Sequence, residues 1–118
     1  MSSVFPAVAP ELHATFIAQT LQPGPAVSLR CVASGAPPPR ISWLLDGGEL
    51  GGSAGLVLGS FLASGGDVIS HLNLTSVRVH HGGLYTCLAT NAAGTAAYSA
   101  PLNIYGKFVS HRKPGEYA

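Results

Sequence analysis

Charge is what this sequence has least of. Asp, Glu, Lys and Arg make up 9% of its 118 residues, against roughly 25% in a typical globular domain. The net charge is +1, and no Lys or Arg occurs between Arg40 and Arg78. A chain of this kind has no basic patch for nucleic acid or for an acidic membrane surface. Nucleic-acid binding is therefore not expected.

Long apolar runs are also missing. No segment approaches the ~18 apolar residues that a membrane-spanning helix needs, so we expect no membrane insertion by this chain itself. The start, MSSVFPAVAPEL, has no basic region and is broken by Pro6 and Pro10, which does not fit a signal peptide. The chain is expected to be a fragment of a longer secreted or membrane protein, or else a cytosolic protein.

Catalytic and metal-binding patterns are absent as well. The sequence has no G-x-S-x-G nucleophile elbow and no glycine-rich loop placed before a helix to hold a phosphate. His80 and His81 are adjacent, and side chains so placed should point apart, whereas a zinc site needs three or four converging ligands. We predict no enzyme activity, no metal site and no cofactor.

Glycine, proline and short alternating runs are what the sequence does contain, with 15 Gly and 9 Pro between apolar segments. Alternation of this kind predicts β-strands. About seven short strands in roughly 95 residues are typical of two packed antiparallel sheets, an all-β sandwich. The strands are expected at 26–33, 40–48, 68–77, 84–91 and 95–105, with a weaker first strand over 11–21 and one or two edge strands within 47–67.

Two cysteines and one tryptophan occupy inward positions of these strands. Cys31 and Cys87 fall on separate strands, and Trp43 follows Cys31 by twelve residues. This spacing, with Tyr85 two residues before the second cysteine, matches the immunoglobulin sandwich, in which a disulfide joins the two sheets and the tyrosine hydroxyl bonds the nearby backbone. Closing the loop would stabilise the fold by roughly 4 kcal/mol. The alternative is two buried free thiols, as in cytosolic relatives.

Residues 10–105 resemble an I-set immunoglobulin domain, through LRCVASGAPPPRISW, LNLTSV and GGLYTCLATNAAG. The core signature beside the cysteines is Trp43, Leu74, Gly83 and Tyr85. The segments FIAQTLQPGPAVSLRCVASG, GDVISHLNLTSV and LNIYG are similar to a central domain of the arthropod Down syndrome cell adhesion molecules.

The resemblance implies a glycosylated extracellular module at the cell surface, part of a larger membrane protein with a tandem array of such domains. That family acts in homophilic adhesion, neuronal self-recognition and axon guidance. The implied partners are immunoglobulin domains of the same family, or neighbouring domains in cis.

The sequence departs from the family at His81, in the glycine-rich stretch 47–59 and in the tail 106–118. His81 stands where the pattern before the second cysteine has Asp, and the basic partner of that Asp is missing too, which we interpret as the loss of a salt bridge. Residues 1–9 are predicted to be an N-terminal extension, and residues 106–118 a C-terminal tail or linker.

Two surface features are candidate sites. Asn73-Leu74-Thr75 is an N-glycosylation sequon, and Asn73 is expected on the outward face of its strand. The charge-poor segment 50–63 is expected to expose an apolar contact for another protein, formed by Leu56, Val57, Leu58 and Phe61.

The residues are also compatible with other functions. The domain could be an inert spacer in the array. It could belong to a soluble arthropod immune receptor that binds microbial ligands, or to an intracellular muscle scaffold, in which case the cysteines would be free thiols.

Overall fold

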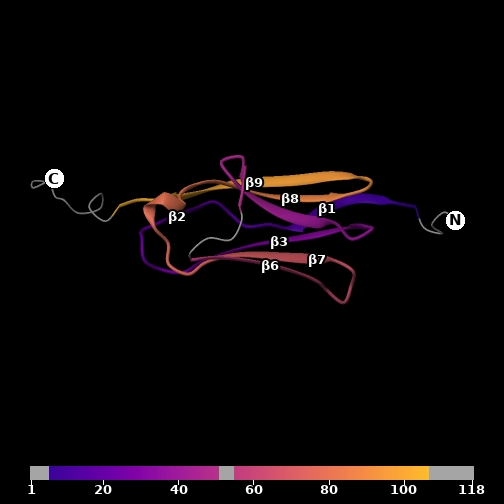
Figure 1. The fold of residues 1–118 in the computed structure, drawn as a ribbon, viewed down its shortest axis with the longest axis horizontal. Helices are drawn as coiled ribbons and strands as arrows, with labels where there is room; N and C mark the ends of the chain where they lie inside the picture. The colour runs from indigo at the N-terminus through magenta and orange to yellow at the C-terminus, as the bar shows by residue number, and fades with distance from the viewer. Residues whose placement is uncertain (1–5, 51–54, 107–118) are drawn as a thin grey trace, which may run out of the picture.

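The computed structural model describes residues 6–50 and 55–106, which form two packed β-sheets (Figure 1). One sheet has the order β1-β3-β7-β6 and the other β2-β9-β8-β4-β5. The first contains β1 (Val8–Ala14), β3 (Val27–Ala36), β7 (Val68–Leu74) and β6 (Leu56–Leu62). The second contains β2 (Gln19–Leu21), β9 (Gly94–Ile104), β8 (Gly83–Asn91), β4 (Arg40–Leu45) and β5 (Gly48–Glu49), and a 3₁₀ turn, η1 (Val79–His81), precedes β8. The predicted all-β sandwich is confirmed.

Alternating burial along the inner strands builds the core. In β7 the side chains of Val68, Ser70, Leu72 and Leu74 are buried and those between them are partly exposed. The same period of two recurs in β8, as expected for strands with one face against the opposite sheet. The alternation predicted from the sequence in these strands is therefore confirmed.

The predicted first strand, 11–21, is wrong as a single element. β1 pairs with β3 in one sheet, whereas β2 pairs with β9 in the other. The chain crosses between the sheets at 15–18, where Phe16 is buried in the core. The burial of Phe16, beside the exposed Ile17, marks this change of sheet.

The β2–β9 pair is parallel, so the expectation of antiparallel strands throughout is corrected. After the change of sheet at 15–18 the chain continues in the direction of β1, and β2 therefore runs in the same direction as β9 (Figure 1). Its register begins at Gln19 opposite Leu102, just past Pro101. Pro101 thus lies where β9 has only β8 beside it, which suits a residue without an N–H group.

Two tight turns join neighbouring strands. Residues 64–67 connect β6 to β7, closed by hydrogen bonds between Ala63 and Asp67 and from Gly66 to Ala63. In the β8–β9 hairpin, the Asn91 side-chain oxygen accepts the N–H groups of Ala93 (2.8 Å) and Gly94 (3.1 Å). Both turns fix the register of the strands that they join.

The segment 47–67 is predicted to contain one or two edge strands, and its described residues contain two, one in each sheet. β5 is a two-residue edge of the second sheet, and β6 is a seven-residue edge of the first. β6 pairs with β7 in continuous register from Leu56 opposite Leu74 to Leu62 opposite Val68. Residues 51–54 of this segment lie outside the described part of the chain.

The chain enters and leaves the sandwich at opposite ends, because β1 begins at one end and β9 finishes at the other (Figure 1). β1 starts at Val8, within the predicted N-terminal extension, and β9 ends at Ile104. Residues 1–5 and 107–118, which include most of the predicted tail, lie outside the described residues. Among the described residues, no helix is long and apolar enough to cross a membrane.

Candidate functional site

A disulfide joins the two sheets at the centre of the core. Cys31 on β3 and Cys87 on β8 are bonded, with their Cα atoms 6.6 Å apart, and both are fully buried. Trp43 on β4 lies opposite Cys87 in the sheet register and is also buried. The predicted pairing is confirmed, and neither sulfur is free to act as a nucleophile or a metal ligand.

Ser70 gives the buried indole a hydrogen-bond partner that the sequence reasoning did not assign. The Trp43 Nε1–H donates to Ser70 Oγ at 2.9 Å, and Ser70 is itself buried. The Ser70 hydroxyl donates to the backbone oxygen of Gly59 at 3.2 Å and accepts from Ser60 Oγ at 3.0 Å. A buried indole N–H needs such a partner, and here the partner connects the core to edge strand β6.

Tyr85 closes the corner before β8. Its hydroxyl donates a hydrogen bond to the backbone oxygen of His81 at 2.5 Å, as predicted. Burial, with a smaller contribution from the Asp46 carboxylate, raises the pKa of Tyr85 to about 12. The hydroxyl therefore stays protonated as a donor throughout the physiological range.

Position 83 has no room for a side chain, because the β4–β5 turn packs against it. The φ of Gly83 is +149°, and a Cβ atom there would lie 2.6 Å from Asp46 Oδ2 and 2.8 Å from Leu45 Cδ1. Asp46 cannot simply move away, because its Oδ1 accepts the Leu84 N–H at 2.9 Å. The glycine of the family signature thus makes room for a carboxylate that holds β8 against the β4–β5 turn.

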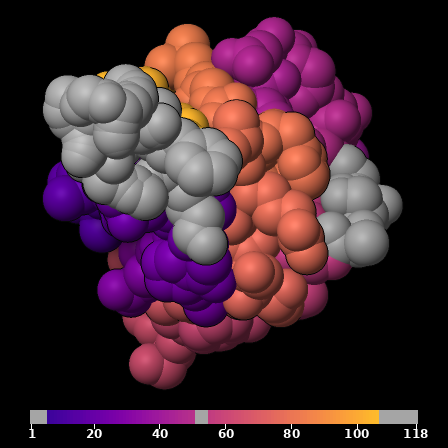
Figure 2. Space-filling model, turned by 90° about the vertical axis from the view of Figure 1, so that its left-hand side faces the viewer, coloured from indigo at the N-terminus to yellow at the C-terminus, as the bar shows by residue number. Residues whose placement is uncertain are grey.

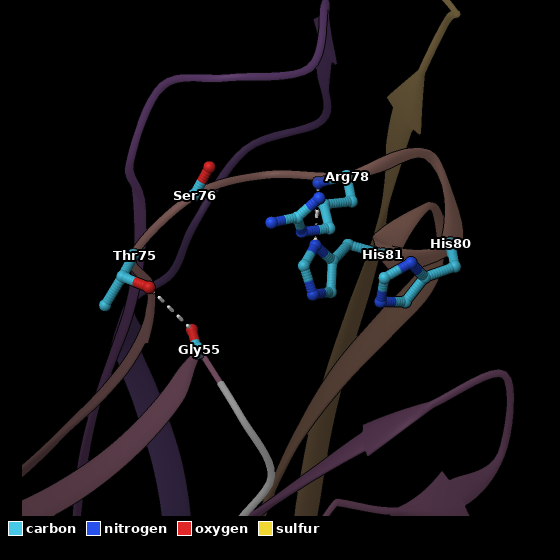
Figure 3. A pocket seen from close by; sticks show the side chains of 6 residues that line it. All are labelled: Gly55, Thr75, Ser76, Arg78, His80 and His81. Carbon is cyan, nitrogen blue, oxygen red and sulfur yellow. Dashed lines mark hydrogen bonds between the residues drawn. The ribbon is translucent and has the colours of Figure 1, made fainter.

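His80 and His81 line one shallow pocket with Arg78, and this corrects the prediction that they point apart (Figure 3). Their ring centroids are 4.3 Å apart with the planes tilted by 45°. Both belong to η1, and the tight 3₁₀ turn brings their side chains to the same side. Figure 2 looks onto the end of the sandwich that carries η1, which belongs to the orange part of the chain.

His81 serves the backbone of this turn rather than an ion pair. The Arg78 N–H donates to His81 Nδ1 at 2.8 Å, and the His81 N–H donates to the Arg78 oxygen at 2.9 Å. An Nδ1 that accepts carries no proton, so the ring is neutral with its proton on Nε2. Burial, followed by the charges of His80 and Arg78, lowers the pKa of His81, which agrees with that role.

The pocket holds too few donor side chains for a metal centre. Within residues 6–50 and 55–106, no group of three or more His, Cys, Asp or Glu side chains comes together to hold a metal ion.

Asn73 lies in the outward row of β7, opposite Val57 of β6. Its Oδ1 accepts the Ser28 hydroxyl at 2.6 Å, which holds the side chain in place by its oxygen. The nitrogen is the atom to which a glycan is joined, so this arrangement is compatible with the sequon. Glycosylation of Asn73 stays a prediction.

The predicted apolar surface lies along β6, with one correction and one addition. Val57, Leu58 and Phe61 expose 54%, 36% and 54% of their surface, whereas Leu56 is buried and belongs to the core. Leu62, which the sequence reasoning missed, is 59% exposed. By strict alternation Leu62 should face the core, because it lies opposite the buried Val68. It is nevertheless exposed because β6 is an edge strand, which only the tertiary structure shows.

The two-sheet fold, the buried disulfide with its tryptophan and the tyrosine corner together define an immunoglobulin domain. The family model of the immunoglobulin domain matches residues 9–91. The chain belongs to this family.

Curated proteins that are similar to this chain include cell adhesion molecules. The chain is 53% identical over 97 residues to the cell adhesion molecule Dscam2 of Drosophila melanogaster, and 36% identical over 97 residues to the cell adhesion molecule DSCAML1 of Homo sapiens. Each alignment covers 82% of this chain and 5% of the relative. The chain is homologous to single immunoglobulin domains of these adhesion molecules and spans a small part of their length.

Among solved structures, immunoglobulin domains of an adhesion molecule and of a muscle protein are similar to this chain. The crystal structure of the N-terminal eight immunoglobulin domains of Down syndrome cell adhesion molecule matches with a TM-score of 0.81 and 44% identity, covering 84% of this chain and 13% of that one. The titin M10–obscurin-like 1 complex matches with a TM-score of 0.75 and 29% identity, covering 86% of this chain and 97% of that one. The TM-score and the sequence identity are both higher for the adhesion molecule than for the muscle protein.

Proposed function

We propose that this domain is a non-catalytic extracellular recognition module that binds immunoglobulin domains of its own family within or between tandem arrays. The observation that carries the proposal is the apolar edge strand β6, three of whose side chains are more than half exposed on an otherwise ordinary immunoglobulin domain. Contiguous exposed apolar surface often marks a protein-binding site.

The cysteine pair supports an extracellular setting. Disulfides persist in oxidising compartments and are rare in the cytosol, so the Cys31–Cys87 bond favours an adhesion molecule over an intracellular muscle scaffold. The positions at which the chain enters and leaves the sandwich, at opposite ends (Figure 1), suit a rod of successive domains.

Bead aggregation tests the binding function. Beads coated with the domain at high density are mixed with beads coated with the same domain, with a neighbouring domain of a relative, or with an unrelated immunoglobulin domain. We expect aggregates in the first two mixtures and none in the third, because multivalent display amplifies weak contacts. Beads that stay dispersed in every mixture would refute recognition and leave an inert spacer.

We also propose that Asn73 carries an N-linked glycan in the secretory pathway. The domain is secreted from insect cells, and its mass is compared with that of Asn73→Gln. A loss of mass on glycosidase treatment is expected for the parent domain and not for the variant, whereas equal masses would show an unoccupied sequon.

A further inference from the structure

Four strands lie at the outer margins of the two sheets, and three of them are poorly suited to pairing. β2 and β5 have three and two residues. β1 carries Glu11 and has irregular register with β3 at two places. Short length, charge and bulges are the usual protections of an exposed edge.

β6 has none of these protections. It is seven residues long, its sequence LVLGSFL has no charge and no proline, and its register with β7 is continuous. Within the residues that the structure describes, no strand lies on its other side. A straight, apolar, unprotected edge offers its backbone to another strand.

The hydrogen bonds at the two ends of β6 show which residues face the free edge. Gly55 accepts from Thr75, and Ala63 donates to Asp67, both across to the β7 side. Since backbone groups alternate in an antiparallel ladder, the odd-numbered residues of β6 bond to β7. Leu56, Leu58, Ser60 and Leu62 therefore direct their N–H and C=O groups outward.

We propose that two copies of this domain pair through β6, antiparallel, about a two-fold axis at Gly59. This inference rests on the proposed recognition function and names its contact. In this register Leu56 lies opposite Leu62 of the second copy and Leu58 lies opposite Ser60. These are the residues with outward backbone groups, so each pair exchanges both hydrogen bonds, and the two four-stranded sheets become one.

The side chains also match in this register. On the outward face Val57 meets Phe61 of the second copy, and both are half exposed in the single domain. On the core-facing side the uncovered Leu58 and Leu62 gain neighbours. Gly59 leaves the axis open, because the position where its Cβ would lie has no atom within 4 Å. No charged side chain of β6 is buried by the pairing.

The contact is small, so the dimer is expected to be weak in solution. One strand edge falls at the low end of protein interfaces, below about 1,200 Å². Binding would then depend on high local concentration, as on a membrane or in an array. Sedimentation equilibrium up to millimolar concentration is the suitable measurement.

Val57→Lys and Val79→Lys form a matched pair of variants. The two valines are 54% and 55% exposed, and each change adds one positive charge, but Val79 belongs to η1 and lines a separate hollow with Pro23 and Gly24. We expect Val57→Lys to raise the dimer dissociation constant at least about tenfold, because an apolar cross-strand contact is replaced by a charge beside Phe61. Val79→Lys should leave it unchanged. Equal effects of the two variants would overturn the pairing.

Gly59→Cys reports on the axis itself. Gly59 faces its own symmetry mate in a non-hydrogen-bonded pair, where Cα atoms are roughly 4.5 Å apart and a disulfide can close. Mild oxidation should therefore cross-link Gly59→Cys into dimers. Gly65→Cys, in the open β6–β7 turn, should not cross-link faster than random collision allows. Equal cross-linking of both would contradict the two-fold register.

Failure of this pairing is distinguishable from failure of recognition. Dimers that form but ignore Val57→Lys and Gly59→Cys would overturn the β6 contact and leave homophilic binding in place. A strict monomer that still aggregates beads coated with a relative's domain would likewise overturn only the β6 pair. A strict monomer with dispersed beads would overturn both.

Discussion

Tyr85 shows how much a single hydroxyl contributes at the residue scale. Tyr85→Phe removes the donor to the His81 oxygen and leaves that carbonyl without this partner. We expect the free energy of unfolding to fall by about 1–2 kcal/mol, measured by urea denaturation. Tyr98→Phe is the control, because Tyr98 is only partly buried and its ring packs edge-on against Phe16. A loss as large as that of Tyr85→Phe would contradict a specific role for the Tyr85 hydroxyl.

The same hydroxyl predicts a response to alkaline pH. The pKa of Tyr85 is about 12 in the folded domain and 10.0 as its ordinary value. Its contribution is therefore fully present below pH 10 and is lost as the pH rises toward 12, because the unfolded chain releases this proton first. Urea denaturation between pH 9 and 12 should show a smaller decline in stability for Tyr85→Phe than for the parent. Parallel declines would contradict this.

His81 predicts a loss of stability on the acid side. In the folded state the pKa of His81 lies below its ordinary value of 6.5. The unfolded chain therefore binds a proton at His81 first as the pH falls. The contribution is fully present above pH 6.5 and declines as the pH drops from 6.5 through the lower folded value. Protonation of Nδ1 would also break the bond from the Arg78 N–H.

His81→Gln is the matched variant for this prediction. The glutamine oxygen can accept the Arg78 N–H, as Gln does at the third position of a capping box, but it does not titrate. Thermal unfolding between pH 4.5 and 8 should show a weaker pH dependence for His81→Gln than for the parent. Identical profiles would mean that His81 titrates alike in both states.

At the scale of elements, strands with one buried face could be predicted and strand partners could not. The alternation in 68–74 and 84–91 predicts which side chains are buried, because a pleated strand exposes every second residue. The division of 11–21 into two strands depends on the crossing at Phe16 and leaves no periodic signal. The exposure of Leu62 likewise depends on β6 being an edge, which is a property of the assembled sheet.

The turn between β4 and β5 packs against the start of β8, and a substitution at Gly83 tests this contact. Gly83→Ala would place a methyl group against Asp46 and would have to be accommodated at φ +149°. We expect the free energy of unfolding to fall by roughly 2 kcal/mol, measured by chemical denaturation. Gly65→Ala, in open space and outside the positive-φ region, should change it by less than about 0.5 kcal/mol. Equal effects would contradict the steric argument.

At the scale of the whole molecule, the proposed array and the proposed β6 pairing use different parts of the sandwich. The chain enters and leaves at opposite ends (Figure 1), so neighbouring domains of an array would leave the sides open. β6 runs along one such side. Weak lateral pairing would then repeat along an array without interference from the domain junctions, and avidity could convert it into adhesion.

The disulfide joins the two halves of the molecule, and its removal is the broadest test of stability. It closes a loop across a sequence separation of 56 residues, so its loss should lower the free energy of unfolding by roughly 4 kcal/mol on the chain-entropy account. That is a large share of the 5–15 kcal/mol typical of a domain. Reduction of the parent domain, followed by thermal unfolding, measures it.

The double variant Cys31→Ala, Cys87→Ala separates the cross-link from packing. Both the reduced parent and the double variant lack the cross-link, but only the variant also loses the two buried sulfur atoms. The reduced parent should therefore account for most of the loss, and the variant should fall further by the cost of the cavity. If reduction alone changes stability by less than about 1 kcal/mol, the core of Trp43, Ser70 and Tyr85 holds the sheets together without the bond.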